Sequence, residues 1–280
     1  MVAYSAMLDV PETLVQHLAG LLTAERRRRG TRTGTRALTC HRQALLILVW
    51  FRKAEDATLL GAGFGISRAT AYRYLSEGIT VLTTQAPDLH EALRRTAADG
   101  WAFVILDGKL FRTDRCAQLT TNRDGKPVHA WYSGKHRAFG GNIQAVIRPD
   151  GLPLWTSPVA EGRTHDSTMA AGLDIYAALY RAADQLGLPA LADSGYHGAG
   201  PGIHTPVKLP VGSTQLTPDQ QAYNKLQRGL RAPGERGFAL LTGRWKALRR
   251  ITASPSRIGT IVQAALTLTH IEHRYTPNPC

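Results

Sequence analysis

The stretch Trp101-Ala-Phe-Val-Ile-Leu-Asp107-Gly108 decides the fold of this sequence. Its apolar residues run continuously instead of alternating with polar ones, which predicts a central strand buried on both faces. A second apolar run ends in the same way, at Leu188-Pro-Ala-Leu-Ala-Asp193. If the two strands are parallel neighbours, both carboxylates lie at the carboxyl edge of one sheet, where open α/β sheets bind ligands.

A pair of neighbouring carboxylates requires a cation or a shared proton, because the two charges repel each other. Mg²⁺ fits such a site, since it is a hard ion usually held by a few carboxylates together with phosphate oxygens. Two such ions about 3.5–4 Å apart can promote phosphodiester cleavage. Either aspartate alone is more simply interpreted as a turn or cap residue, but their matching context favours a metal site.

Glu235 is the natural third ligand, because it is the sole acid among the many basic residues between 225 and 250. A metal-binding carboxylate set among phosphate-binding cations is what a DNA-cutting site requires. A local interpretation also stays open. Pro233 would then be the first residue of a helix and Glu235 the third, where the helix dipole favours an acid and Arg231 could pair with it.

His165 and Asp166, in Glu161-Gly-Arg-Thr-His-Asp166-Ser, form another polar pair. Such a pair could bind a metal or a phosphate. Alternatively, Asp166 would cap the helix that follows, and from the residues alone this cap is the favoured interpretation.

The segment from Ala57 to Leu75 has the layout of a helix-turn-helix, with Gly63 and Gly65 in the turn and Ser67 as N-cap. The residues expected to face inward are Leu59, Leu60, Ile66, Ala71 and Leu75. The residues expected to enter the major groove are Arg68, Ala69, Tyr72 and Arg73. A plain three-helix bundle with a solvated basic face is the alternative, but the coincidence of turn, cap and arginine pair favours DNA binding.

The charge of the chain points to a polyanionic partner. Of its 280 residues, 43% are apolar and 20% charged, an ordinary globular composition, yet the net charge is +13. The last 60 residues hold ten Lys or Arg against two acids. Nucleic acid is the simplest partner for such an excess.

Cysteine usage and hydropathy indicate the compartment. Cys40, Cys116 and Cys280 fit neither a disulfide framework nor a zinc cluster, which favours a reducing environment. The first 20 residues contain acids and Pro11 where a signal peptide would need an apolar run, and no stretch reaches the roughly 18–20 apolar residues of a membrane span. We expect a cytoplasmic protein, associated with the nucleoid if it is bacterial.

The order of elements predicts a mixed α/β protein preceded by helices. A helix is expected over 11–29, where Arg26–Arg29 would be a solvated, dipole-matched end or an arm on DNA phosphate. Residues 30–37 read as a linker. The expected helices and strands are, in order, helices 38–53, 55–63 and 67–83, strands 101–107, 111–120, 138–149 and 152–160, helix 172–187, strand 188–193, a loop with a short strand at 204–208, and helices from 217 broken near 233 and 255.

These residues together resemble the DDE transposases of bacterial insertion sequences, in the branch related to eukaryotic Harbinger elements, the insertion-sequence family numbered five. The matching pieces are Leu106-Asp107-Gly108, Tyr132-Ser-Gly-Lys135, Gly162-Arg-Thr-His-Asp166, Ala192-Asp193-Ser-Gly-Tyr196-His-Gly198, Leu216-Thr-Pro-Asp-Gln-Gln-Ala-Tyr-Asn224, Gly234-Glu235-Arg-Gly-Phe238 and the helix-turn-helix. The resemblance covers residues 35–275 approximately. Its order and spacing are specific although no single piece is.

The resemblance implies a ribonuclease-H-like mixed-sheet catalytic core behind an all-α helix-turn-helix domain. Asp107, Asp193 and Glu235 would bind Mg²⁺, or Mn²⁺ in its place, as two ions. His165 and Asp166 match a recurrent motif of the family and would lie near that site. The enzyme would cut the terminal inverted repeats of its element and join them to target DNA, as a homodimer or larger assembly on double-stranded DNA. Domain limits would fall at 1–34 for the first helix and linker, 35–95, 96–275, and a tail at 276–280.

Some positions depart from the relatives' pattern. Relatives often have Val before the glutamate within a continuous helix, where this chain has Pro233-Gly234. They often have Lys seven residues later, where this chain has Thr242. Arg244 or Lys246 would therefore take over the phosphate contact of that Lys, whereas Arg231, four residues before the glutamate, and Lys135 match the relatives' pattern and are also expected to contact DNA.

Two rivals to an active transposase remain. One is an inactive or domesticated copy that only binds DNA through its helix-turn-helix. The other is a different Mg²⁺-dependent DNA endonuclease.

Overall fold

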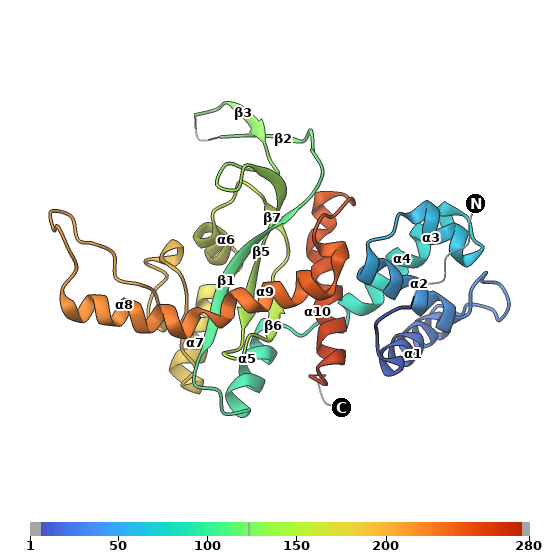
Figure 1. Cartoon of the computed structure of the whole chain (residues 1–280), viewed down its shortest axis with the longest axis horizontal. Helices are drawn as coiled ribbons and strands as arrows, with labels where there is room; N and C mark the ends of the chain where they lie inside the picture. Colours follow the sequence, from blue (N-terminus) through green and yellow to red (C-terminus); the bar gives the residue numbers. More distant parts are fainter. Residues whose placement is uncertain (1–6, 123, 276–280) are drawn as a thin grey trace. The chain divides into compact units, whose positions relative to one another are not determined.

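The structure is a computed structural model that describes residues 7–122 and 124–275. It contains two compact units (Figure 1). The helical unit combines residues up to 86 with 241–250 and those from 260 onward, and the sheet unit combines 87–240 with 251–259. This division differs from the expected limits, because the first helix and two C-terminal segments join the helix-turn-helix. The expected tail at 276–280 lies outside the described residues.

Four helices open the helical unit, within a few residues of their expected bounds: α1 (Glu12–Arg28), α2 (Cys40–Lys53), α3 (Ala57–Phe64) and α4 (Arg68–Thr83). The inner face of α1 is formed by Leu14, Leu18 and Leu22, which are almost fully buried. No helix in the described part of the chain is long and apolar enough to span a membrane.

The turn between α3 and α4 confirms part of the expected motif. Gly65 has φ +70°, and the Ser67 hydroxyl accepts a hydrogen bond from the Thr70 N–H at 3.2 Å. Gly61, which we did not single out, is the glycine that permits the close approach, since a Cβ there would lie 2.8 Å from the Ile66 carbonyl oxygen; around Gly63 the space is open. Leu59 was wrongly placed inside, because it is 62% exposed.

Segments far along the chain complete the helical unit. Trp245, just before the short 3₁₀ helix η2 (Lys246–Leu248), is fully buried and meets Phe51 edge-on, with ring centroids 6.1 Å apart. In α10 (Ile258–Glu272) the Thr267 hydroxyl donates to the Leu82 carbonyl oxygen at 3.0 Å. Contacts distant in sequence therefore hold this unit together.

The sheet unit is built around β1 (Val104–Arg112), which lies between β5 (Ala138–Ile147) and β8 (Ala190–Leu191). The pairings of β1 with β5 and of β5 with β6 (Pro153–Thr156) are antiparallel. Those of β1 with β8 and of β8 with β9 (Ile203–His204) are parallel. This is the mixed sheet expected of a ribonuclease-H-like core.

Shorter elements surround this sheet (Figure 1). The far edge of β5 also pairs with β4 (Tyr132–Ser133) and β7 (Ala160–Glu161), and a separate ribbon joins β2 (Leu119–Thr121) to β3 (Pro127–His129). The remaining helices are α5 (Leu89–Ala98), α6 (Asp166–Gly172), α7 (Ile175–Leu186), η1 (Ser194–Tyr196), α8 (Pro218–Arg231), α9 (Pro233–Arg244) and η3 (Pro255–Arg257).

One expectation about these elements was wrong, and two helices were missed. The strands expected at 101–107 and 111–120 are largely one strand, because β5 pairs with β1 continuously from Ile105 to Arg112. The helix expected at 172–187 is confirmed as α7, but the short helix α6 that precedes it was not expected. We missed α5, although Asp88 caps it by accepting from the Glu91 N–H at 2.8 Å, and an acid three residues after a cap residue is a recognised helix start.

Candidate active site

Asp107 lies in the middle of β1, half-buried. Because side chains alternate along a strand, Asp107 shares its face with Ile105 and Lys109. Helix α9 packs on this face without intervening side chains, since a Cβ on Gly234 would lie 2.8 Å from Cγ2 of Ile105. The carboxylate therefore lies on the sheet face that α9 covers.

Asp193 lies two residues after the end of β8, at the position that an extended register sets opposite Asp107. The parallel pairing joins Val104 to Ala190 and Ile105 to Leu191, and continuing this register two residues further places Asp193 beside Asp107. The Oδ1 atom of Asp193 accepts from the Gly195 N–H at 2.8 Å and so caps η1. A carboxylate has acceptor capacity beyond one such bond, so Asp193 can cap and still bind a ligand.

The electrostatics of Asp107 also indicate a carboxylate cluster. Burial raises the pKa of the Asp107 carboxyl to about 6, and the charges of Asp193 and Asp166 act in the same direction. The Gly108 N–H and the Arg231 guanidinium lower that pKa and partly oppose the shift. Asp107 thus interacts electrostatically with two further carboxylates, Asp193 and Asp166, and with one cation, Arg231. An excess of negative charge of this kind favours binding of a positive ion.

Glu235 is the third residue of α9, as the local interpretation predicted, and it is exposed. Ala232, the single residue between α8 and α9, has helical φ and ψ, so the two helices run on almost continuously (Figure 1). Arg231 and Glu235 therefore occupy one side of this helical stretch, one turn apart. The charge of Arg231 lowers the pKa of Asp107, and the backbone at Gly234 lies against Ile105. The start of α9 therefore lies beside β1.

Asp166 does not cap α6, contrary to our expectation. The N-cap position is His165, without a side-chain hydrogen bond, and Asp166 is the first helical residue. Its Oδ1 atom instead accepts from Asn142 Nδ2 at 2.7 Å and from Gln144 Nε2 at 3.2 Å. Gly108 makes room for this arrangement, because a Cβ there would lie 2.5 Å from that same oxygen.

Two hydrogen bonds through the buried Gln144 side chain link Asp166 to the segment that carries Asp193. The Tyr196 hydroxyl donates to Oε1 of Gln144, whose amide nitrogen donates to Asp166. Burial, followed by the charges of Asp166, Asp107 and Asp193, holds the pKa of Tyr196 well above its usual range. The sequence reasoning missed Asn142 and Gln144, although they are polar residues in an otherwise apolar strand.

Beside Asp166 lies a small pocket of about 180 Å³ between the β4–β5 and β7–α6 turns. Its lining includes the cationic or titratable residues Lys135, His136, Arg163 and His165. Lys135 is two-thirds exposed and lies 3.4 Å from Oδ2 of Asp166. Lys135, His165 and Asp166, three residues selected from the sequence, are thus brought together here.

The side chains around Asp107 are compatible with a divalent metal. Asp107 and Asp193 supply hard oxygen donors, and one or two carboxylates with phosphate oxygens and water are the usual ligand set of Mg²⁺. Within residues 7–122 and 124–275, however, no three acidic, His or Cys side chains already converge on one point. Glu235 would have to turn toward the two aspartates to complete a triad.

Comparison with known families agrees with this geometry. A family model described as DDE superfamily endonuclease matches residues 106–270, which is more than half of the chain and includes Asp107, Asp193 and Glu235. The chain belongs to the DDE superfamily endonucleases. A second model, the helix-turn-helix of DDE superfamily endonuclease, matches residues 36–88. Searches of curated proteins and of solved structures gave no match.

A DDE superfamily endonuclease with a helix-turn-helix binds DNA and cleaves it, generally with divalent metal ions. The residues expected to reach DNA from α4 are all exposed, namely Arg68, Ala69, Tyr72 and Arg73. The Arg68 guanidinium lies over the Tyr72 ring, 5.5 Å from its centroid. This face of α4 therefore presents cations and an aromatic ring to solvent.

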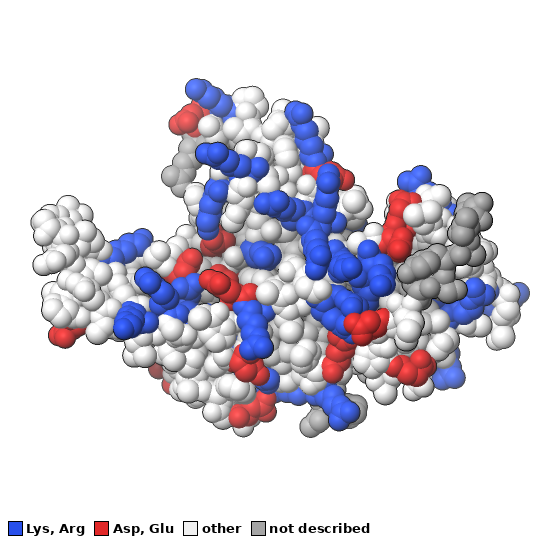
Figure 2. All heavy atoms as spheres, in the orientation of Figure 1, with Lys and Arg blue, Asp and Glu red and all other residues white. Residues whose placement is uncertain are grey.

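The remaining basic candidates of this endonuclease differ from one another. Helix α8 carries Lys225, Arg228 and Arg231 against the single acid Asp219, and Lys and Arg side chains are visible over this region in Figure 2. Lys246 is exposed. Arg244 is not available as we expected, because it makes a bidentate pair with Glu272 at 2.5–3.1 Å and another with Asp9 at 2.9 Å. We reassign Arg244 to holding the helical unit together.

Proposed function

We propose that the chain is a transposase of a bacterial insertion sequence in the Harbinger-related branch. It would bind the terminal inverted repeats of its element through α4, cut the DNA beside them and join the ends to a target. Because two ends must meet, a dimer on the DNA is the working form, acting on the nucleoid in the cytoplasm. The single observation that carries this proposal is the parallel pairing of β1 with β8, which, continued by two residues, sets Asp193 beside Asp107 on the strand that the first turn of α9, with Glu235, contacts.

Each residue of the proposed site has a distinct role in DNA cleavage. Asp107, Asp193 and Glu235 would hold Mg²⁺, which supplies activation of the attacking oxygen and stabilisation of the leaving oxygen. Asp107 is mostly ionised at neutral pH, because its pKa is about 6. Arg231 holds down that pKa and is a cation close enough to the carboxylates to orient a substrate phosphate. Gln144 and Tyr196 fix the segment that carries Asp193.

The first test replaces Asp107 by Asn. We expect strand cleavage of supercoiled DNA that contains the element ends to fall to the background rate, because an amide binds a divalent cation poorly. Binding to the ends, measured by gel shift, should be unchanged. Asp99→Asn, at the exposed end of α5, is the matched control and should cleave normally. Normal cleavage by Asp107→Asn would refute the proposed site.

A copy that only binds DNA is the second candidate, and the exposure of Glu235 favours it. A nicking assay with and without Mg²⁺ decides between the two, since a protein that only binds leaves the plasmid intact at every metal concentration. Cleavage without preference for paired inverted repeats would instead indicate another endonuclease. Short inverted repeats on either side of the reading frame would identify the substrate of the transposase.

A further inference from the structure

The segment between α1 and α2 is a built structure and not a free linker. Gly30, with φ +62°, ends α1 in a Schellman turn, in which the Thr31 N–H donates to the Arg26 carbonyl oxygen and the Gly30 N–H to that of Arg27, both at 2.9 Å. A second turn follows, where the Thr35 hydroxyl donates to the Arg32 carbonyl oxygen at 2.7 Å and Gly34 has φ +80°. Residues 31–37 thus have a defined path.

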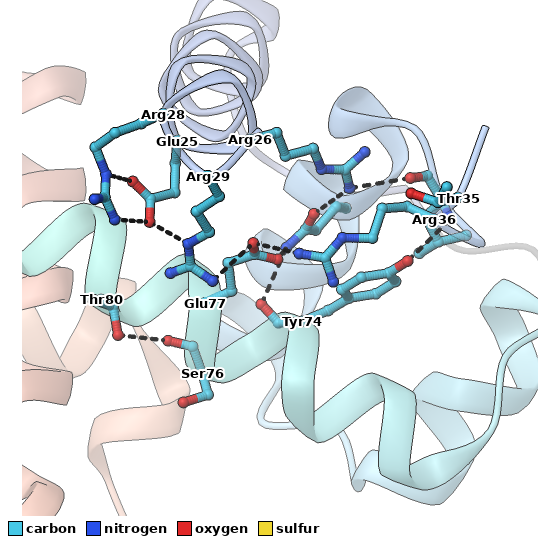
Figure 3. A network of polar contacts seen from close by, with 12 residues as sticks. Glu25, Arg26, Arg28, Arg29, Thr35, Arg36, Tyr74, Ser76, Glu77 and Thr80 are labelled. Carbon is cyan, nitrogen blue, oxygen red and sulfur yellow. Dashed lines mark hydrogen bonds and ion pairs between the residues drawn. The ribbon is translucent and has the colours of Figure 1, made fainter. Parts of the chain in front are cut away.

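A buried carboxylate of α4 fixes the end of this segment. Glu77, whose side chain is only 5% exposed, pairs with Arg36 at 2.7 Å and accepts from Gln43 at 2.9 Å (Figure 3). The Tyr74 hydroxyl accepts from the Leu38 N–H at 3.2 Å, and the Arg36 guanidinium lies over the Tyr74 ring. Residues of the α4 helix therefore hold the segment directly.

The arginines at the end of α1 are of two kinds. Arg26 donates to Gln43 Oε1 at 2.6 Å, and Arg28 and Arg29 pair with Glu25 (Figure 3). Arg27 and Arg32 are exposed, and in the described part of the chain neither makes an ion pair or a side-chain hydrogen bond. Arg26, Arg28 and Arg29 are therefore bound within the protein, whereas Arg27 and Arg32 are available to a partner.

Two hollows show what lies around these side chains. One, of about 430 Å³, is lined by Arg26, Arg27, Arg32 and Arg36 together with threonine hydroxyls. The other, of about 230 Å³, lies between residues 35–37 and the first turns of α4, including Arg73. Neither lining contains a carboxylate among the described residues. Indeed, residues 26–54 contain nine Lys or Arg and no acid.

We propose that residues 31–37, together with Arg27 in the last turn of α1, form a preformed arm that binds DNA backbone phosphates next to the groove contacted by α4. Arg27 and Arg32 contact the phosphates, and Arg36 is a strut that holds the arm against Glu77. The arm adds affinity without reading bases, because phosphate contacts position a protein and carry no sequence information. The inference rests on the proposed DNA binding by α4 and names additional residues for it.

The test measures how the affinity of the full chain for a fluorescein-labelled duplex of mixed sequence depends on salt. Each phosphate contact steepens the plot of log affinity against log salt by about 0.9. Arg27→Ala/Arg32→Ala should therefore flatten the slope by about 1.8. The control Arg28→Ala/Lys53→Ala removes the same charge from exposed helix ends of the same unit and should change the slope much less. Equal slopes for the two double variants would overturn the arm.

A further variant separates contact from positioning. Glu77→Gln keeps Arg27 and Arg32 but removes the ion pair that holds Arg36. The arm is then positioned less well, so the affinity for DNA should fall while the salt slope stays that of the wild type. An unchanged affinity would refute the proposed positioning role of the Arg36–Glu77 pair. Arg68→Ala/Arg73→Ala distinguishes the two levels of inference. If it weakens binding while Arg27→Ala/Arg32→Ala does not, the arm is wrong and DNA binding by α4 stands; if the wild type does not bind the duplex, both fail.

Discussion

At the scale of single residues, Asp107 shows what a sequence can and cannot locate. Its carboxylate was predicted from the end of an apolar run, yet β1 continues to Arg112. An apolar run ends where one face stops being buried, and the hydrogen bonds to β5 continue past that point. The partnership with Asp193 was predictable because the two runs match. The strand limits were not, since they depend on the neighbouring strand.

Asp107 should also make stability depend on pH in metal-free protein. A carboxyl with a raised pKa binds its proton more tightly in the folded state, so stability is lost as pH rises from its ordinary value of 3.8 through about 6. Asp107→Asn removes this cost. In EDTA we expect its unfolding free energy to exceed that of the wild type by up to about 3 kcal/mol above pH 6, with the excess vanishing in acid.

Urea denaturation at several pH values measures this difference. Titrating groups away from the site contribute equally to the two proteins, so the difference reports Asp107 together with its coupling to Asp193 and Asp166. Asp99→Asn again serves as the control, since Asp99 is exposed at a helix end. A difference that stays constant with pH would show that Asp107 is not desolvated in the folded protein.

Asp166 was placed near the site by resemblance and given the wrong local role by pattern. An acid at a helix start predicts a cap, but Asn142 and Gln144 lie close enough to bind the carboxylate instead. Those partners lie on β5, more than 20 residues away, and only the register of β5 with β1 brings them over Gly108. No local pattern contains that information.

At the scale of elements, the Pro233-Gly234 pair has a different meaning in the structure from the one the sequence suggested. It was expected to break the helix that carries Glu235. Pro233 instead begins α9 directly after a helical Ala232, because a first helical residue needs no N–H donor. Gly234 allows α9 to contact Ile105 closely. The pair therefore brings Glu235 toward the sheet.

Gly234→Ala should accordingly damage both stability and cleavage. The new methyl group would overlap Ile105 in a fully buried contact, and overpacking of this kind costs about 1–3 kcal/mol. Gly229→Ala in α8 is the matched control, because no atom lies within 4 Å of its Cβ position, and it should stabilise by up to about 1 kcal/mol. Thermal melts and the nicking assay measure both effects. Equal behaviour of the two variants would exclude the close contact of α9 with β1.

The helix-turn-helix was predictable almost to the residue, because its helices, cap and turn are local. The misplacement of Leu59 inside it has a geometric cause. A one-residue shift rotates a helix position by about 100°, so the inward face of α3 contains Ala57, Leu60 and Gly61 and excludes Leu59. Hydrophobicity alone could not separate Leu59 from Leu60.

At the scale of the whole molecule, the helical unit is assembled from three separated segments of the chain. The sequence suggested that a domain of residues 35–95 ends before the catalytic core begins. Local periodicity cannot show that Trp245 packs on Phe51, or that the Arg244–Glu272 pair belongs to this unit. DNA binding and catalysis are therefore linked by the path of the chain itself, since α9 begins in the sheet unit and ends in the helical one.

A fragment of residues 35–95 should consequently fail to fold cooperatively. It lacks α1, which buries Leu14, Leu18 and Leu22, and it lacks Trp245. Losing one large buried side chain costs about 3–5 kcal/mol, and the whole stability of a domain is about 5–15 kcal/mol. We expect a broad melt by circular dichroism and a poorly dispersed amide spectrum, whereas residues 7–275 should melt sharply. A sharp melt and a dispersed spectrum from the short fragment would mean that the helix-turn-helix folds without α1 and the C-terminal segments.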